Sequence, residues 1–197
     1  MRKILFLVCL PLVLADAPAL AAKPADAVID GTWESACLPI GKNGRHGFVV
    51  RVTIARKTMT AVSQTYAHSN CDTPTVKIDY RAKIVARAVS GDAVDFDHVV
   101  TSITMTAQHP EVVTIYNADN ANAGCGMGGG WVLDVPRQVE GRNCAPLMLP
   151  VAGTRLYERA WVVDGQLKIG SFPVVWANTS PDKRPTAPGL LVLHRVT

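Results

Sequence analysis

The chain has 197 residues, of which 48% are hydrophobic and 18% charged, and a formal net charge of +4. This composition is typical of a globular protein large enough to bury one sizeable core. The charge is too small and too evenly spread for a nucleic-acid-binding surface. Beyond the N-terminus no stretch approaches 18 consecutive apolar residues, so we expect no membrane-spanning helix in the mature chain and a soluble protein.

The N-terminal segment has the three parts of a secretion signal. Met1–Lys3 is cationic, Ile4–Ala15 is apolar, and Ala19–Ala21 is an A-x-A cleavage site. An apolar run this short cannot cross roughly 30 Å of hydrocarbon as a helix. The sequence therefore predicts a signal peptide over residues 1–21 and an exported protein, either periplasmic or secreted.

Four cysteines remain after the signal: Cys37, Cys71, Cys125 and Cys144. An even number in an exported chain favours two disulfides, with three pairings possible. We favour Cys37–Cys71 with Cys125–Cys144, because each bridge then closes a short segment. Loop entropy assigns roughly 3–4 kcal/mol to each bridge.

The rest of the chain alternates apolar and polar residues with a period of two. Residues 48–54 and 76–84 alternate most clearly, as half-buried antiparallel strands do. Weaker strand patterns cover Thr32–Leu38, Thr58–Tyr66, His98–Thr106, Val112–Tyr116, Leu156–Val163, Gln166–Ile169 and Leu190–Val196.

Turn residues separate these strands. Asp164-Gly165 predicts a type I′ hairpin, because both central residues of that turn need positive φ. Ser90–Asp92 and Arg56-Lys57 predict two further hairpins, and no dozen-residue stretch has an apolar stripe at helical spacing. The segments 117–130, 136–150 and 177–188 are rich in turn-forming residues and indicate loops. We predict an all-β fold of roughly eight to ten antiparallel strands in a closed or nearly closed up-and-down barrel.

A short motif near the N-terminus and a basic residue near the C-terminus together form a pattern typical of one group of barrel proteins. Gly31-Thr32-Trp33, together with Arg195, resembles the signature of the calycin superfamily, which includes lipocalins, fatty-acid-binding proteins and avidins. The resemblance implies a lipocalin-like barrel in which Arg195 lies across the indole of Trp33 and closes the base. Such a contact contributes about 0.5–2 kcal/mol. A different β-barrel or a sandwich would also satisfy the strand pattern.

On this reading, residues 22–30 form a short lead and residues 31–197 form a single barrel domain. The resemblance implies an interior cavity for a small, mostly apolar molecule. Candidate ligand-binding residues are those in or beside strands that could reach the interior: Tyr80, His98, Tyr116, Arg159 and Trp161. Aromatic side chains could equally fill the barrel, since an eight-stranded interior permits this.

Other patterns favour structural roles. The glycine-rich segment 124–131 lacks the context of a phosphate-binding loop, and no two histidines stand at metal-ligand spacing. No G-x-S-x-G or H-E-x-x-H motif is present, so we expect no metal or cofactor and favour a protein without catalytic activity. An enzyme whose histidines and carboxylates come together from separate strands stays open as a third reading. The polar face of one long strand would carry four basic residues: Lys77, Arg81, Lys83 and Arg87. Such a row is either a solvated face of the sheet or a surface that binds an anionic partner.

The sequence therefore predicts an exported, non-catalytic protein that holds a small apolar or amphipathic ligand. The alternative is an interaction module of the cell envelope, such as a hydrolase inhibitor. Its barrel would be solid, and the loops 117–130 and 177–188 would make the contacts.

Overall fold

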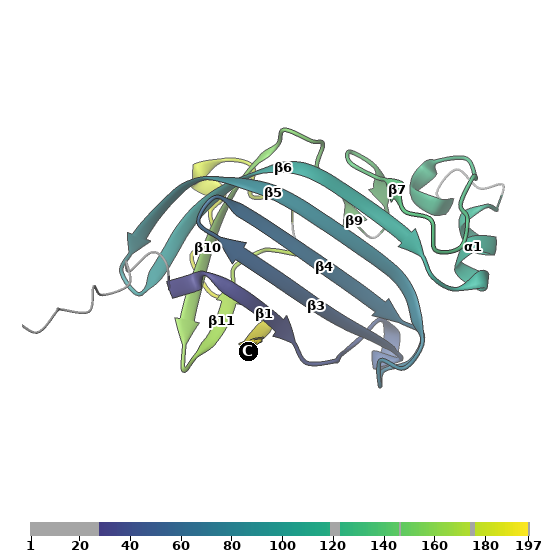
Figure 1. Cartoon of the computed structure of the whole chain (residues 1–197), viewed down its shortest axis with the longest axis horizontal. Coiled ribbons are helices and arrows are strands. Elements are labelled where there is room, and N and C mark those ends of the chain that lie inside the picture. The colour runs from purple at the N-terminus through teal and green to yellow at the C-terminus, as the bar shows by residue number, and fades with distance from the viewer. Residues whose placement is uncertain (1–27, 119–122, 146, 174–175, 197) are drawn as a thin grey trace, which may run out of the picture.

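The computed structural model describes residues 28–118, 123–145, 147–173 and 176–196. The predicted signal peptide, residues 1–21, and most of the predicted lead lie outside these ranges. Within them, eight strands close into an antiparallel barrel (Figure 1). The all-β prediction is confirmed.

The barrel strands follow one another around the wall in chain order, as in an up-and-down barrel. They are β1 (Gly31–Ser35), β3 (His46–Ala55), β4 (Thr58–Tyr66), β5 (Pro74–Ser90), β6 (Ala93–Ala107), β10 (Arg155–Val163), β11 (Gln166–Ile169) and β12 (Val192–Arg195). β1 pairs with β3 on one side and with β12 on the other, and these two pairings close the barrel.

The remaining elements are short. They are β2 (Leu38–Ile40), β7 (Arg137–Gln138), β8 (Asn143–Cys144), β9 (Leu147–Met148), the helix α1 (Pro110–Tyr116) and the 3-10 turns η2 (Lys42–Gly44), η3 (Ala123–Gly126) and η4 (Pro181–Lys183). β2 continues the sheet beside β3, β7 adds to β6, and β8 pairs with β9. In Figure 1, α1, β7 and β9 gather at one end of the barrel, which we call the open end.

The opposite end, which we call the closed end, is packed with side chains. Val50, Val52 and Ile54 of β3 are buried there, as their alternation predicts, together with Trp33 of β1 and Met59 of β4. The closed end is therefore a solid hydrophobic core.

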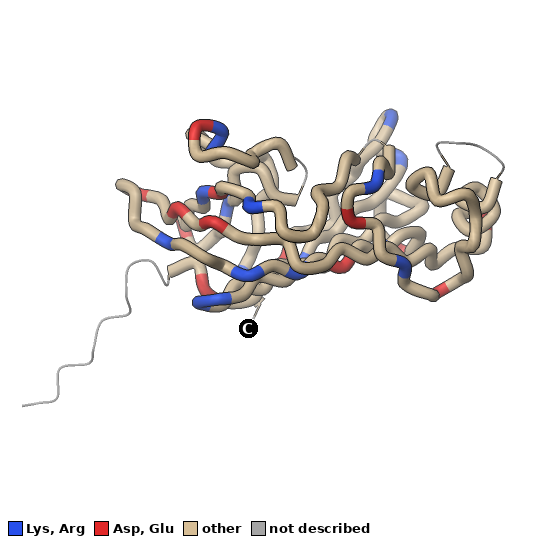
Figure 2. The backbone as a smooth tube through the Cα atoms, turned by 90° about the horizontal axis from the view of Figure 1, so that it is seen from above, with Lys and Arg blue, Asp and Glu red and all other residues tan. Residues whose placement is uncertain are grey.

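The type I′ hairpin and the disulfide pairing are confirmed. Asp164 has φ 52° and Gly165 has φ 73°, both positive as the turn requires. Cys37 is bonded to Cys71 and Cys125 to Cys144. Basic and acidic residues are interspersed along the backbone (Figure 2), as the even charge distribution suggested.

The strand predicted over Val112–Tyr116 is wrong, because this segment belongs to helix α1. Pro110 occupies the first turn, where its missing N–H costs nothing, and the His109 side chain accepts a hydrogen bond from the Glu111 N–H. Local capping therefore outweighs the β-branched residues of the segment.

The strand predicted over Thr32–Leu38 divides into two. β1 ends at Ser35 and β2 begins at Leu38, and both pair with β3. The Ser35 hydroxyl accepts a hydrogen bond from the Val50 N–H, 3.0 Å away, next to the break.

Arg87 does not share the polar face of β5 with Lys77, Arg81 and Lys83. The register with β6 shifts between Ile84 and Ala86, so one extra residue enters β5 there. An inserted residue reverses the alternation of faces. Arg87 consequently lies opposite the buried Phe96, on the inner side of the sheet.

Candidate ligand-binding cavity

A cavity of about 290 Å³ lies toward the open end of the barrel. Its walls are mostly aliphatic and aromatic: Ile40, Phe48, Ser63, Thr65, Val76, Ile78, Tyr80, Leu147, Phe172, Pro173 and Trp176. Its volume is near the lower limit of pockets that hold small organic molecules.

The sheet supplies one wall through simple alternation. Val76, Ile78 and Tyr80 are successive inward residues of β5, and Ser63 and Thr65 are successive inward residues of β4. Their outward neighbours on β5, such as Lys77 and Asp79, form an ion pair on the other face. A period of two thus gives β5 one apolar face toward the cavity and one polar face toward solvent.

Two short elements attached to disulfides form part of the rim. Ile40 lies in β2, three residues after Cys37, and Leu147 lies in β9, three residues after Cys144. Each bridge therefore anchors a segment that lines the cavity.

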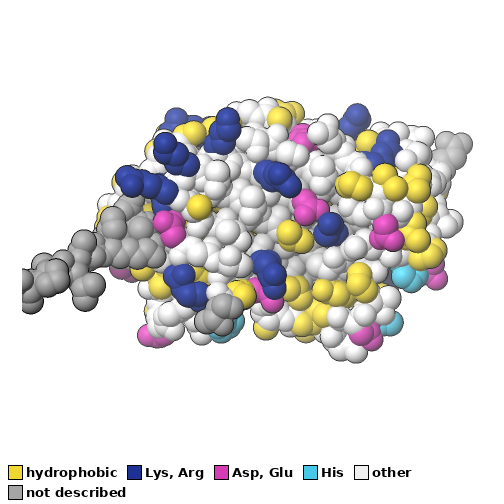
Figure 3. All heavy atoms as spheres, in the orientation of Figure 1, with side chains coloured by type: hydrophobic (Ala, Val, Ile, Leu, Met, Phe, Trp, Pro, Cys, Tyr) yellow, Lys and Arg dark blue, Asp and Glu magenta, His cyan; other side chains and the backbone are white. Residues whose placement is uncertain are grey.

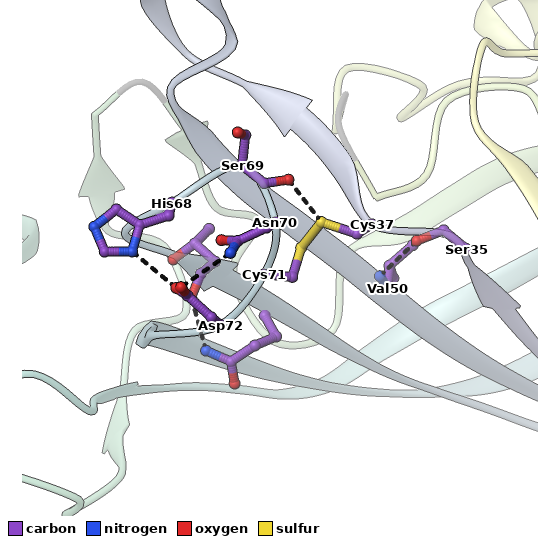
Figure 4. Close-up of a disulfide and its surroundings, with 10 residues drawn as sticks. Ser35, Cys37, Val50, His68, Ser69, Asn70, Cys71 and Asp72 are labelled. Carbon is purple, nitrogen blue, oxygen red and sulfur yellow. Dashed lines mark hydrogen bonds and ion pairs between the residues drawn. A yellow bond between two sulfur atoms is a disulfide. The ribbon is translucent and has the colours of Figure 1, made fainter.

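The Cys37–Cys71 bridge lies among polar side chains at the surface (Figure 4). His68 Nδ1 is 2.8 Å from Asp72 Oδ1, and Asn70 also donates to the carboxylate of Asp72. The hydrogen bond from His68, followed by further side-chain bonds, lowers the pKa of Asp72 to about 2. These contacts order the loop that carries Cys71.

Three aromatic rings pack together in the cavity wall, one from the sheet and two from the segment after β11. The ring centroids of Tyr80 and Phe172 are 5.0 Å apart, and that of Trp176 is 5.3 Å from each of the other two. Such tilted and edge-on contacts are the favoured arrangements of aromatic rings. Phe172 and Trp176 come from the segment after β11, so this loop completes the cavity.

His98 lies behind this wall. The Tyr80 hydroxyl is 2.9 Å from His98 Nδ1, and His98 is fully buried. Burial lowers the pKa of His98 to about 4, so the imidazole is neutral at pH 7, and burial also raises the pKa of Tyr80. The pair is therefore an uncharged hydrogen-bonded unit.

Glu158 is a buried carboxyl group that holds the aromatic loop. It is 1% exposed, and burial raises its pKa to about 7. The Asn178 amide donates to its Oε1, and the Ser171 N–H donates to its Oε2 at 3.3 Å. These two donors flank Phe172 and Trp176 in the chain, so Glu158 fixes both ends of the segment that carries them.

Arg184 ties the following segment to the outside of β10 and β6. Its guanidinium donates to the Glu158 carbonyl oxygen and to Asp97 Oδ1, each at 2.6 Å, and lies over the Tyr157 ring. It is also 3.5 Å from Asp95. The loop 177–188 is therefore fastened to the barrel at this point.

The structure brings together two of the five predicted ligand residues, Tyr80 in the cavity wall and His98 behind it. Tyr116 lies on α1, where it packs on Trp131 with 4.9 Å between ring centroids. Arg159 forms an ion pair with Asp95. Trp161 shares the outward parity of Arg159 on β10 and does not line the cavity.

Sequence reasoning missed Phe48, Phe172 and the rim residues Ile40 and Leu147. The alternation on residues 48–54 pointed to Phe48, since it shares the face of Val50 and Val52. No periodic signal marks Phe172, Ile40 or Leu147, because they belong to loops and very short strands.

The lining residues carry no side chain that is charged at pH 7. Tyr80, Ser63 and Thr65 supply the side-chain hydroxyls, and the other lining side chains are apolar apart from the indole of Trp176. Such a surface holds a ligand by burial of apolar area rather than by ion pairing.

No family model and no curated protein matches this sequence. Among the described residues the chain forms a closed antiparallel barrel of eight strands. No helix in the described ranges is long and apolar enough to cross a membrane.

Proposed function

We propose that this chain is an exported, calycin-type barrel protein that binds a small apolar or amphipathic molecule without transforming it. The observation that carries the proposal is the cavity of about 290 Å³ with its almost wholly apolar lining. The cavity lies beside a solid core at the closed end, so the barrel is filled at one end and hollow toward the other.

The closure of the barrel supports the calycin assignment. The guanidinium carbon of Arg195 lies 4.1 Å from the centroid of the Trp33 indole, and the two residues are direct partners on β12 and β1. This is the arrangement that the resemblance implies. Two disulfides support export, because such bonds persist in oxidising compartments, whether the periplasm or the extracellular space.

Burial alone supplies useful affinity. Removing about 300 Å² of apolar ligand surface from water contributes about 7 kcal/mol before association costs are subtracted. A weak to moderate affinity therefore needs no charged group in the cavity. The hydroxyls of Tyr80, Ser63 and Thr65 can select among ligands that carry one polar group.

The alternative, an interaction module acting through its loops, gains less support. Arg184 fastens the loop 177–188 to the barrel through Asp95, Asp97 and the Glu158 carbonyl, so this loop is less free to engage a partner. Under this alternative, an envelope hydrolase would bind the protein even when the cavity is filled.

The test uses a neutral fluorescent probe, N-phenyl-1-naphthylamine, with the purified mature protein. Ser63 lines the cavity, whereas its neighbour Val62 on β4 is exposed on the outer face. Ser63→Trp should weaken probe binding at least tenfold by filling the cavity, and Val62→Trp adds the same ring outside and should leave binding unchanged. Absence of saturable binding by the native protein, or equal binding by both folded variants, would contradict the proposal.

A further inference from the structure

A second hollow, of about 280 Å³, lies on β5 away from the apolar cavity. The turn between β3 and β4 contributes Arg56 and Lys57, and β5 contributes Ile84, Val85, Ala86 and Arg87. Half of these lining residues are cations. On the face shown in Figure 3, Lys and Arg side chains gather toward the end of the molecule where the hairpin of β5 and β6 lies.

The backbone of this hollow is irregular. Val85 is the extra residue of the β5 bulge and has no partner on β6 among the described residues. Pairing of β5 with β4 ends at Lys83, and the Ile84 N–H donates to the Lys57 carbonyl oxygen at 2.9 Å. This hydrogen bond holds the turn with Arg56 and Lys57 beside the bulge, at the point where β5 stops pairing with β4.

Arg87 has hydrogen-bonding capacity that its protein neighbours leave unused. Its side chain is 6% exposed, and Nη2 lies 2.7 Å from Asp30 Oδ1. Nε and Nη1 are buried and have no acceptor within the part of the chain that the structure describes. Unfilled donors on a buried guanidinium are unfavourable, so an acceptor at this place would stabilise the fold.

The charges favour an anion as that acceptor. The lining contains three cations and no carboxylate, and Asp30, the ion-pair partner of Arg87, offsets one of these charges, so the lining stays net positive. Arginine binds phosphate oxygens through its planar fork of N–H donors, and lysine adds a compact point charge. We propose that the hollow formed by Arg56, Lys57 and Arg87 binds a phosphate group, either of a soluble phosphate compound or of a lipid headgroup.

This site is separate from the apolar cavity. The cavity uses Val76–Tyr80 of β5, and the hollow uses residues 84–87 of the same strand. Probe binding in the cavity and phosphate binding in the hollow can therefore succeed or fail independently.

The first test is a titration of the folded mature protein with inorganic phosphate, followed through backbone amide resonances at constant ionic strength. We expect saturable shifts at residues 56–57 and 84–87. The variant R56Q/K57Q changes exposed turn residues and should weaken binding at least tenfold. The control K42Q/K183Q removes two exposed lysines elsewhere, for the same change in net charge, and should bind as the native protein does.

Arg87→Met, where the variant folds, is a second test of the site in the same titration. We expect it to lose the saturable shifts completely. Absence of saturable shifts at the hollow would overturn the proposal. Equal weakening of phosphate binding in R56Q/K57Q and K42Q/K183Q would also overturn it, because the effect would then come from the overall charge of the protein and not from this site.

Co-sedimentation with phosphatidylglycerol vesicles distinguishes a lipid headgroup from a soluble phosphate compound. Vesicle binding that R56Q/K57Q abolishes and phosphate competes away assigns a lipid headgroup, and phosphate binding without vesicle binding assigns a soluble compound.

Discussion

Trp33 and Arg195 join the two ends of the chain at the closed end of the barrel. The guanidinium carbon lies 4.1 Å from the indole centroid. The Trp33 Nε1–H donates to the Ile29 carbonyl oxygen at 2.9 Å, and Arg195 donates to the carbonyl oxygens of Asp30 at 2.9 Å and Val28 at 3.3 Å. The pair therefore fastens residues 28–30 across the base as well as closing the sheet.

Arg195→Ala should lower the free energy of unfolding by about 2 kcal/mol, because it removes a cation–π contact and two hydrogen bonds. Arg195→Lys keeps the charge but not the paired donors, and should recover only part of this loss. Urea unfolding with the disulfides intact measures both. Equal stability of Arg195→Ala and the native protein would show that the contact between Arg195 and Trp33 does not stabilise the closed end.

Gly31→Ala should destabilise the same end for a different reason. Gly31 has φ +137°, and a Cβ atom there would clash with Arg195 Nη1. Backbone strain of this kind costs about 1–3 kcal/mol, and displacement of Arg195 adds to it. Gly91→Ala is the matched control, because Gly91 has φ +63° and nothing within 4 Å of the added atom. Thermal unfolding should rank Gly31→Ala as the less stable; the reverse order would contradict the assigned contact.

Glu158 should make the protein less stable as the pH rises. Its pKa is about 7 in the folded state, against an ordinary value of 4.5. Below the ordinary value the carboxyl is neutral in both states. Between these pH values it ionises in the unfolded chain but stays protonated in the fold. Stability from this group is therefore complete at low pH and lost by neutral pH, by about 3 kcal/mol.

Glu158→Gln removes this titration, so the variant should gain stability relative to the native protein as the pH rises from 4.5 to 7. His98 has the opposite effect, since its lowered pKa of about 4 removes stability as the pH falls. Both proteins keep His98, so its effect cancels in the difference between their urea-unfolding curves. Glu111→Gln, at an exposed position on α1, is the control. A pH-independent difference for Glu158→Gln would show that the folded carboxyl titrates normally.

Each disulfide should support both stability and ligand binding. The bridges span sequence separations of 34 and 19 residues, and loop entropy gives about 3–4 kcal/mol for either one. The paired replacements Cys37→Ser with Cys71→Ser, and Cys125→Ser with Cys144→Ser, should each lower stability by that order. They should also weaken probe binding, because the bridges anchor the rim residues Ile40 and Leu147. Unchanged affinity for the probe in a folded variant would show that the missing bridge does not support the cavity.

Local patterns predicted most of the barrel. The strands over Thr58–Tyr66 and Gln166–Ile169 have the bounds that the sequence indicated, because alternation and turn residues are strong local signals. Helix α1 was missed because a proline and a side-chain cap outweighed strand-forming residues over a short segment. Arg87 was placed on the wrong face because a bulge depends on pairing with a neighbouring strand, which alternation along one strand does not reveal.

For the candidate site, too, local patterns predicted the residues on regular strands and missed those in loops. Tyr80 was predictable because it follows Val76 and Ile78 on one face of a regular strand. Tyr116, Arg159 and Trp161 were chosen for their residue types and proximity to strand patterns, and none of them lines the cavity. Phe172 and Trp176 line it because Glu158, through Ser171 and Asn178, holds their loop against Tyr80. These contacts join residues that no spacing rule connects.

By itself the sequence determined the strand periodicity, the principal turns and the favoured cysteine pairing, since each depends on residues close together or on a simple count. Only the tertiary structure decided that the barrel is filled at one end and hollow toward the other. The reason is physical: cavity volume depends on how side chains from distant strands and loops pack together, and alternation gives the facing of a side chain but not the space left beside it.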